Sequence, residues 1–349
     1  MTTNADTPAE QTAPSGGGSG RRSGAARIFN ARVAEASLLP FAFVVVIAIF
    51  GLLRPDTFFQ WSNFTSIFGL NAPTLVLVMA LLIPLTNGDL DLSIAELFGM
   101  TAVIVGWLNV NHHWAIVPAI IVAIVIGVLS GAITGGLIVH FDVNPLIITL
   151  AMGSVYDGVA FWLPDQQSIP GISPNLSNWT TLHHLLGIPL DFWYGIVIML
   201  IMFYVLTFTP FGQRSLFVGQ SREVARLSGF KVNRTRFWAF VVGGLIAAIG
   251  GVLQDGVLGT AIPANQGPLL LTVYAAAFLG LTTIQPGRFN AVGAGVSVFF
   301  LAVAVNGMNL LGAQTYVQQL FYGVFLVIAV VGSRVINRRR AASAAKATT

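Results

Sequence analysis

The chain alternates between long apolar segments and short polar ones from residue 38 to residue 333. Most of the apolar segments have about the 20 residues that an α-helix needs to cross a lipid bilayer. We therefore predict an all-α integral membrane protein, built as a bundle of about ten transmembrane helices. The predicted spans are residues 38–53, 67–86, 92–110, 115–139, 144–163, 191–210, 237–258, 269–285, 290–310 and 317–333.

The composition supports this fold class. Of the 349 residues, 55% are hydrophobic and only 9% are charged, whereas a soluble domain carries about 25% charged residues. The chain has no cysteine, which excludes disulfides, thiol catalysis and thiolate metal sites. Its five histidines show no metal-ligand spacing, so we expect no metal site. The basic residues are scattered around the apolar spans, which indicates membrane topology and no nucleic-acid partner.

The distribution of basic residues predicts that both termini are cytoplasmic. In this orientation, sixteen of the seventeen Lys and Arg fall in cytoplasmic segments and only Arg54 falls outside. Cytoplasmic loops of membrane proteins carry such an excess of positive charge. We divide the chain into a disordered cytoplasmic tail (1–36), a membrane domain (37–335) and a basic cytoplasmic tail (336–349). A cleavable signal peptide is the alternative at the N-terminus, but the apolar run from Leu38 begins too late for one.

The most basic segment, residues 211–236, lies between two apolar spans and holds six of the Lys and Arg. Within it, Ser221–Leu227 has the pattern of a short helix, and Gly229 stands where a C-cap is expected. A short surface helix of this kind fits a groove of a partner protein. The alternative is a solvated basic loop that only sets topology. The chain has no G-x-x-x-x-G-K-[ST] motif, so we expect it to hydrolyse no ATP and to bind no cofactor.

Asn87–Ser93 places two acids and an amide between the second and third predicted spans. Acidic residues near membrane depth are costly unless they line a cavity or cap a helix. Asp91 or Ser93 is a suitable N-cap for the helix that enters at Ile94. Two interpretations stay open: a capped turn at the cytoplasmic surface, and a broken helix whose ends lie near the midplane.

Polar residues also interrupt other spans. Asp157 is a hypothetical functional residue because acids in membrane helices are rare; it either faces a pore or opens at an outer vestibule. Asn306 and Asn309 share one helical face and either bond a hydroxylated solute or tie neighbouring helices together. Small residues recur at helical spacing within 127–135 and 243–251, which predicts close helix packing.

Five motifs of the chain resemble the membrane subunit of the ribose-, xylose- and galactose-type ABC sugar importers. They are Gly88–Ile94, Val143–Leu150, Glu223–Val232, Leu279–Arg288 and Asn306–Gly312. The motifs occur in the order that the family has, and the resemblance covers residues 37–335.

The chain departs from the family's pattern in three places. Ala95 and Glu96 replace small residues, Asp157 stands where many relatives have Arg, and Gln285–Pro286 replaces small residues before Gly287. Each departure changes the polarity or size of a side chain, so the resemblance leaves the sugar unspecified.

The resemblance implies a permease subunit of an ATP-driven importer for a monosaccharide or similar polyhydroxylated solute, in the bacterial plasma membrane. The permease itself is not an enzyme, since ATP and Mg²⁺ would be held by separate cytoplasmic ATP-binding subunits. A second permease subunit, identical or closely related, and an extracytoplasmic solute-binding protein would complete the assembly. The residues implied in coupling to the ATP-binding subunits are Glu223, Ala225, Arg226, Ser228 and Gly229. The residues expected along the translocation pathway are Asp91, Asn144, Asp157 and Asn309.

Three other functions compete with a sugar importer. A nucleoside or a furanone-like signal is the alternative solute for the same machinery. An ion- or proton-coupled secondary transporter would use Asp157 and Glu96 as carriers, but it has no use for a docking helix in the basic segment. An integral membrane enzyme is disfavoured because no constellation of His, Ser or metal ligands is available.

Overall fold

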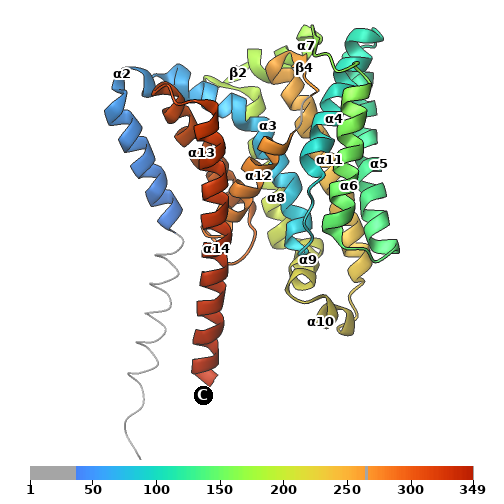
Figure 1. Ribbon diagram of the computed structural model, residues 1–349, viewed down its shortest axis with the longest axis vertical. Coiled ribbons are helices and arrows are strands. Elements are labelled where there is room, and N and C mark those ends of the chain that lie inside the picture. The colour runs from blue at the N-terminus through green and yellow to red at the C-terminus, as the bar shows by residue number, and fades with distance from the viewer. Residues whose placement is uncertain (1–36, 264–265, 349) are drawn as a thin grey trace, which may run out of the picture.

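The computed structural model describes residues 37–263 and 266–348 (Figure 1). Residues 333–348 are described by their backbone only. The regular secondary structure of the described residues is helical apart from four two-residue strands. The helices are Ser37–Leu53, α2 (Pro55–Phe58), α3 (Trp61–Thr86), α4 (Ile94–Gly106), η1 (Trp107–Asn111), α5 (Ile116–His140), α6 (Pro145–Trp162), α7 (Pro174–Ser177), η2 (Asn178–Leu182), α8 (Leu190–Phe208), α9 (Pro210–Gln220), α10 (Arg222–Leu227), α11 (Val232–Leu258), α12 (Gly267–Gly280), α13 (Ala291–Leu310) and α14 (Thr315–Thr348).

The strands form two small antiparallel pairs. β1 (Ile169–Pro170) pairs with β4 (Thr260–Ala261), and β2 (His184–Leu185) pairs with β3 (Ile188–Pro189). β2 and β4 lie with α7 at one end of the bundle, and α9 and α10 lie at the other (Figure 1). The first described helix begins, and α14 ends, toward the α10 end, in keeping with termini that share one side.

The predicted all-α membrane fold is confirmed at the level of its helices. Every predicted span corresponds to a helix of the described chain, and eight of these helices are long and apolar enough to cross a membrane. The other two, Ser37–Leu53 and Gly267–Gly280, are shorter, so the number of ten crossings stays a prediction. The predicted tail 1–36 lies outside the described residues, and the backbone of α14 continues as a helix through most of the predicted tail 336–349.

Several predicted boundaries are wrong, because polar residues extend or break the helices. α3 begins at Trp61, six residues before the predicted start, and in its polar first turns Thr65 and Ser66 both donate to the carbonyl of Ser62. The predicted span 191–210 ends at Phe208, since Thr209 caps a new helix, α9, with Pro210 in its first position. Residues 211–236 are therefore not a loop but α9, α10 and the first turn of α11.

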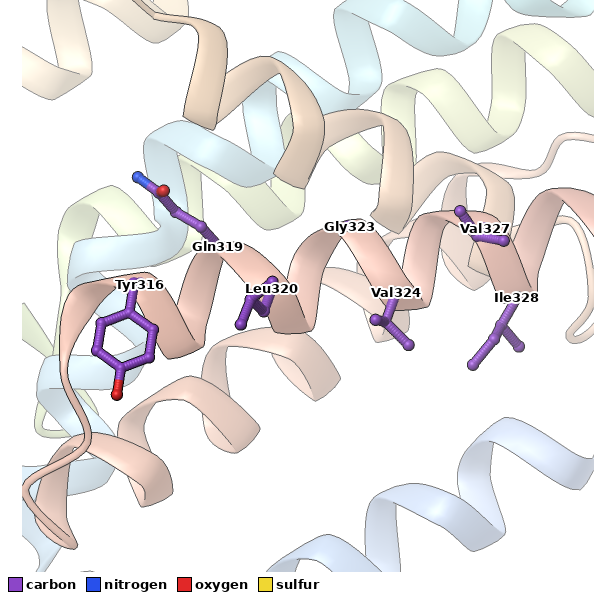
Figure 2. A pocket seen from close by; sticks show the side chains of 7 residues that line it. All are labelled: Tyr316, Gln319, Leu320, Gly323, Val324, Val327 and Ile328. Carbon is purple, nitrogen blue, oxygen red and sulfur yellow. The ribbon is translucent and has the colours of Figure 1, made fainter.

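Helices on the outside of the bundle keep apolar faces exposed. Only 6% of the membrane-length part of α14 is buried, against 72% for α3. A pocket along the exposed face of α14 is lined by Tyr316, Gln319, Leu320, Gly323, Val324, Val327 and Ile328 (Figure 2). Exposed apolar side chains of this kind are stable next to lipid, which agrees with a membrane protein.

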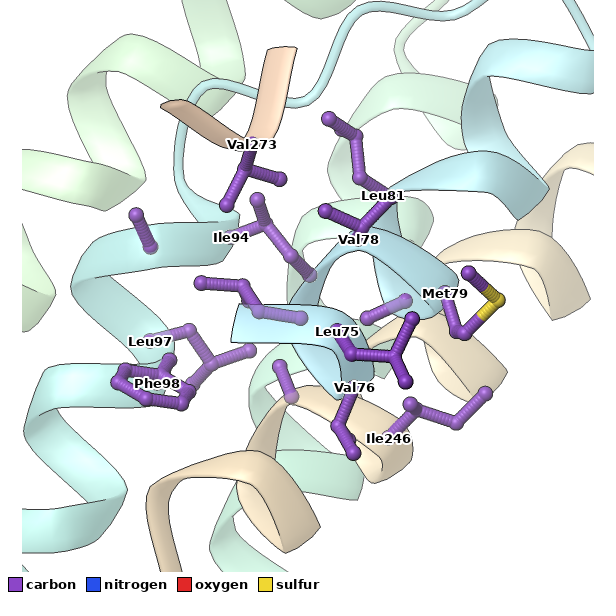
Figure 3. Close-up of a cluster of buried hydrophobic side chains, with 14 of the residues drawn as sticks. Leu75, Val76, Val78, Met79, Leu81, Ile94, Leu97, Phe98, Ile246 and Val273 are labelled. Carbon is purple, nitrogen blue, oxygen red and sulfur yellow. The ribbon is translucent and has the colours of Figure 1, made fainter. Parts of the chain in front are cut away.

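The core is built around α3, α4, α11 and α12, whose apolar side chains interdigitate (Figure 3). α3 is apolar on all sides from Leu75 to Leu85 and is buried along that length, as expected of a helix surrounded by protein. α11 packs along α5, where a Cβ atom at Gly131 would overlap the backbone of Phe240. The predicted close packing through small residues is confirmed at this contact.

The chain doubles back inside the bundle at two places. After α3 it returns through the segment Asn87–Ser93 before α4 begins, and after α11 it returns before the short helix α12 begins (Figure 1). The beginnings of α4 and α12 meet, because both carboxylate oxygens of Glu96 accept from the backbone N–H of Gln266 at 3.2 Å. Carboxylates are favourable at the amide end of a helix.

Candidate functional site

α10 is a six-residue helix with a cap at each end. Ser221 Oγ accepts from the backbone N–H of Val224 at 3.3 Å, the usual N-cap arrangement. At the other end Gly229 has a φ of +82°, and the N–H of Phe230 donates to the carbonyl of Ala225 at 3.1 Å. This pattern is a Schellman motif. The C-cap at Gly229 was predicted from local sequence and is confirmed, whereas Ser221, predicted as the first residue of the helix, is its N-cap.

α10 has one buried and one exposed face. Ala225 is fully buried, where it packs with Val218 of α9 and Val232 of α11. Glu223 and Arg226 are exposed, and Leu227 is 82% exposed. Ser228 and Gly229, which follow the helix, are also exposed. The predicted coupling residues therefore divide into Ala225, which fixes the helix to the bundle, and four that are accessible to a partner.

Asp89, which was not selected from the sequence, lies beside α10 and pairs with two arginines. Its Oδ2 accepts from Arg236 Nε at 2.8 Å and its Oδ1 from Arg236 Nη2 at 2.9 Å, a bidentate pair. Arg222 Nη2 of α10 donates to the same Oδ1 at 2.6 Å. The Asp89 side chain is 0% exposed, that of Arg236 4% and that of Arg222 43%. Burial of the charges strengthens these bonds relative to a surface ion pair.

No local signal could have predicted this cluster. Arg222 and Arg236 lie 133 and 147 residues after Asp89. The only indication in the sequence is that Asp89 is a second acid near Asp91, in a short segment between two apolar spans.

The remainder of the segment is bonded to α6 and α12. The hydroxyl of Tyr274 donates to the backbone carbonyl of Asp91 at 3.0 Å, and the N–H of Leu92 donates to Thr149 Oγ1 at 3.1 Å. Asn87, Asp89 and Asp91 are at most 3% exposed. The polar side chains of the segment are thus buried in protein, while Gly88 is exposed. Burial of the two acids and the amide favours the broken-helix interpretation.

The predicted side-chain cap of α4 is wrong. Asp91 Oδ1 accepts from the N–H and the hydroxyl of Ser93 at 2.9 and 2.6 Å, and Ser93 itself makes no side-chain cap bond to α4. The carboxylate thereby fixes the turn that precedes the helix. The first turn of α4 instead presents Glu96 to α12.

Asp157, for which the sequence offered no partner, is brought beside Glu96. A Cβ atom at Gly153, one turn before Asp157 in α6, would lie 3.7 Å from Glu96 Cγ. Asp157 Oδ1 is buried with no hydrogen-bond partner among the described residues. The side chain of Gln266 reaches the same place over Gly99, where a Cβ atom would come within 2.9 Å of it. Three polar side chains from α4, α6 and the start of α12 therefore gather inside the bundle.

The other two predicted pathway residues lie apart from this group. Asn144 is exposed at the start of α6, where its Oδ1 caps the helix by accepting from the N–H of Leu146 at 3.0 Å. Asn309 is exposed near the end of α13 and accepts from Gln318 Nε2 at 2.6 Å. A small pocket beside Asn309 is lined by Ser66, Ile67, Leu70, Asn71, Ala302, Val305, Asn306 and Tyr322. Of the four predicted pathway residues, the structure places Asp157 near Glu96 and Asp91 in the segment before α4. Asn144 shares a pocket with Gly88 and Leu90 of that segment, and Asn309 lies near the end of α13.

Comparison with known proteins gives consistent matches over most of the chain. A family model described as the permease component of branched-chain amino acid transport systems matches residues 63–330. The chain is 26% identical over 298 residues to a D-allose transport system permease protein of Escherichia coli K12, covering 85% of this chain and 91% of that protein. It is 29% identical over 291 residues to a ribose import permease protein of Bacillus subtilis 168, covering 83% and 90%.

A third relative is an L-arabinose ABC transporter permease protein of Azospirillum brasilense, 29% identical over 306 residues, which cover 86% of this chain and 88% of that protein. The alignments therefore run through nearly the whole of each relative. No solved structure gives a significant match to the chain.

Proposed function

This chain belongs to the permease family of branched-chain amino acid transport systems, and on that premise we propose that it forms the solute pathway of an ATP-driven sugar importer. It is a multi-pass protein of the bacterial inner membrane. The relatives are named for allose, ribose and arabinose, so the solute proposed is a monosaccharide or a similar polyhydroxylated compound.

The observation that carries the proposal is α10, a capped helix at one end of the bundle with an exposed outer face. An importer that hydrolyses no ATP itself needs a surface on which ATP-binding subunits act. Glu223, Arg226 and the 82% exposed Leu227 offer charge and apolar area together, which suits insertion into a partner's groove. Ser228 and Gly229 complete this surface. We assign α10 as the coupling helix and its end of the bundle as cytoplasmic.

The proposed pathway follows the group of Glu96, Asp157 and Gln266. Carboxylate oxygens accept hydrogen bonds and a primary amide both accepts and donates, so together they suit the hydroxyl groups of a neutral sugar. Asp91 supports this group from the segment beside it, and Asn144 and Asn309 are placed in the proposal near the two ends of the route. A contact of this kind would be weak and transient, as passage requires.

The proposed assembly has three further kinds of subunit. Members of this permease family work with ATP-binding and solute-binding proteins, and we propose cytoplasmic subunits that bind ATP and Mg²⁺, an extracytoplasmic protein that delivers the sugar, and a second permease. ATP binding would move the coupling helices and alternate the access of the pathway between the two sides.

Uptake into proteoliposomes tests the proposal. The permease is reconstituted with its ATP-binding subunit and solute-binding protein, and the entry of labelled D-ribose, D-allose and L-arabinose is measured. We expect at least one sugar to accumulate only when ATP is present. Accumulation driven by an ion gradient without ATP would contradict the proposal and favour a secondary transporter. ATP-dependent uptake of a nucleoside and of none of the sugars would support an ATP-driven importer but contradict a sugar as its solute.

A further inference from the structure

The buried segment Asn87–Ser93 contacts both the proposed coupling helix and the helices of the proposed pathway. Arg222, in the first turn of α10, donates to Asp89 Oδ1 at 2.6 Å. A few residues further along the segment, Tyr274 of α12 and Thr149 of α6 bond its backbone at 3.0 and 3.1 Å. The same segment is thus bonded at one end to α10 and at the other to α6 and α12.

We propose that Arg222 and Asp89 link α10 mechanically to this segment, so that a movement of α10 shifts the positions of α6 and α12. The inference rests on the proposed function, because it needs an ATP-driven partner that moves α10. Arg222 and Asp89 are positioning residues, which act on the solute contacts through the segment.

The two arginines that pair with Asp89 differ in what they do. Arg236 stabilises the fold, and Arg222 is available to link α10 to the segment. A buried carboxylate needs one cation, and Arg236 of α11, whose side chain is 4% exposed, supplies it with two hydrogen bonds. Arg222 is a second cation on the same carboxylate, is 43% exposed and belongs to α10. Folding therefore does not depend on Arg222 in the way that it depends on Arg236, and the bond that Arg222 adds joins two elements that could move relative to each other.

Packing contacts could also carry movement from the same end of the bundle. Ala225 packs α10 on Val218 and Val232. Gly219, at the end of α9, packs so closely on the end of α3 that a Cβ atom would overlap the carbonyl oxygen of Thr86. This contact is steric and does not include Arg222. A substitution of Arg222 therefore removes the charged contact with Asp89 and leaves the steric contact between Gly219 and Thr86 in place.

The test compares Arg222→Gln with Arg54→Gln in the reconstituted complex. Arg222→Gln removes the bond from α10 and leaves Asp89 paired with Arg236. Arg54→Gln makes the same substitution at an exposed arginine between Ser37–Leu53 and α2, and serves as the control. The two quantities measured are ATP hydrolysis and uptake of whichever of D-ribose, D-allose and L-arabinose the wild-type complex imports.

We expect Arg222→Gln to keep its ATP hydrolysis and to raise the ATP consumed per sugar by about fivefold or more, the lower range of measured coupling between sites. Arg222→Lys, which keeps one charged donor, should restore part of the coupling, and Arg54→Gln should behave as wild type. An unchanged ratio of ATP to sugar in Arg222→Gln would overturn the link. So would a complex that fails to assemble, since Arg222 would then serve docking.

Spin labels give a second measurement that needs no solute. The chain has no cysteine, so labels can be attached at Val155→Cys in α6 and Leu200→Cys in α8, both 53% exposed. ATP with vanadate should change the distance between the labels in the wild-type complex and not in Arg222→Gln. The same change in both would overturn the link. A wild-type complex without ATP-dependent uptake would instead refute the proposed function itself.

Discussion

The left-handed backbone of Gly229, with φ at +82°, holds the end of α10 in place. A β-branched residue at such an angle costs about 1–3 kcal/mol. We predict that Gly229→Val loosens the C-cap of α10 and weakens binding of the ATP-binding subunit by about tenfold, the equivalent of 1.4 kcal/mol. Gly229→Asn is the control, because Asn tolerates this conformation. Binding measured by titration of the purified subunits would contradict the account if both variants bound like wild type.

Asp157 has a buried carboxylate oxygen without a hydrogen-bond partner among the described residues. We predict that Asp157→Asn, which keeps the size of the side chain and removes its charge, changes the KM or the rate of uptake about tenfold, since hydrogen bonds to charged groups contribute roughly 1.5–3 kcal/mol. Initial uptake rates across the three sugars measure the effect.

Asp165→Asn is the matched control, because Asp165 is exposed in the connection after α6. Unchanged kinetics in Asp157→Asn for all three sugars would assign Asp157 to packing and remove it from the pathway.

At this scale, the residues that could be predicted are those whose partners are close in sequence. Ser221 and Gly229 cap a helix within a few residues of themselves, and a local pattern identifies them. Asp89 is bonded to residues 133 and 147 positions away, so only the folded chain brings them together. Asp157 was selected as an acid in a membrane helix, but nothing in the sequence indicated that Glu96 lies beside it in the fold.

The contact between α5 and α11 depends on glycines that let the two backbones approach. A Cβ atom at Gly131 would overlap the carbonyl oxygen of Phe240, and overpacking of this kind costs about 1–3 kcal/mol. We predict that Gly131→Ala lowers the melting temperature of the purified protein in detergent. Gly136→Ala is the control on the same helix, because its Cβ atom would meet only an ordinary contact at 4.0 Å. Equal melting temperatures for the two variants would contradict the close approach.

Helices could be predicted where a long apolar run decides them, as in α3, α5 and α13. The prediction failed for α9 and for the first turn of α11, since these are helices of mixed polarity at the surface and their sequence reads as a basic loop. It also made α12 too long, because the apolar residues continue past Gly280 into a turn. In that turn Gly287 has a φ of +87°, which a helix does not accommodate.

At the scale of the whole molecule, two interrupted passages bring the beginnings of α4 and α12 together inside the bundle. Glu96 accepts hydrogen bonds from the start of α12, and the segment before α4 reaches α10 through Asp89 and Arg222. The amino-acid pattern left open whether Asn87–Ser93 was a surface turn or a broken helix. Composition cannot distinguish the two, since acids and amides occur both in surface turns and in broken helices. Only the burial of these residues in the folded chain distinguishes a surface turn from a broken helix.

Whether α10 docks an ATP-binding subunit is tested by the amount of that subunit that co-purifies with the tagged permease in mild detergent. Wild type is compared with Leu227→Asp on α10 and with Leu186→Asp in the hairpin at the opposite end. These two leucines are 82% and 79% exposed, so the same charge is introduced at surfaces of similar accessibility. We expect wild type and Leu186→Asp to retain the ATP-binding subunit and Leu227→Asp to lose most of it. A wild-type permease that purifies without any ATP-binding subunit, or a Leu227→Asp variant that retains it fully, would contradict the account.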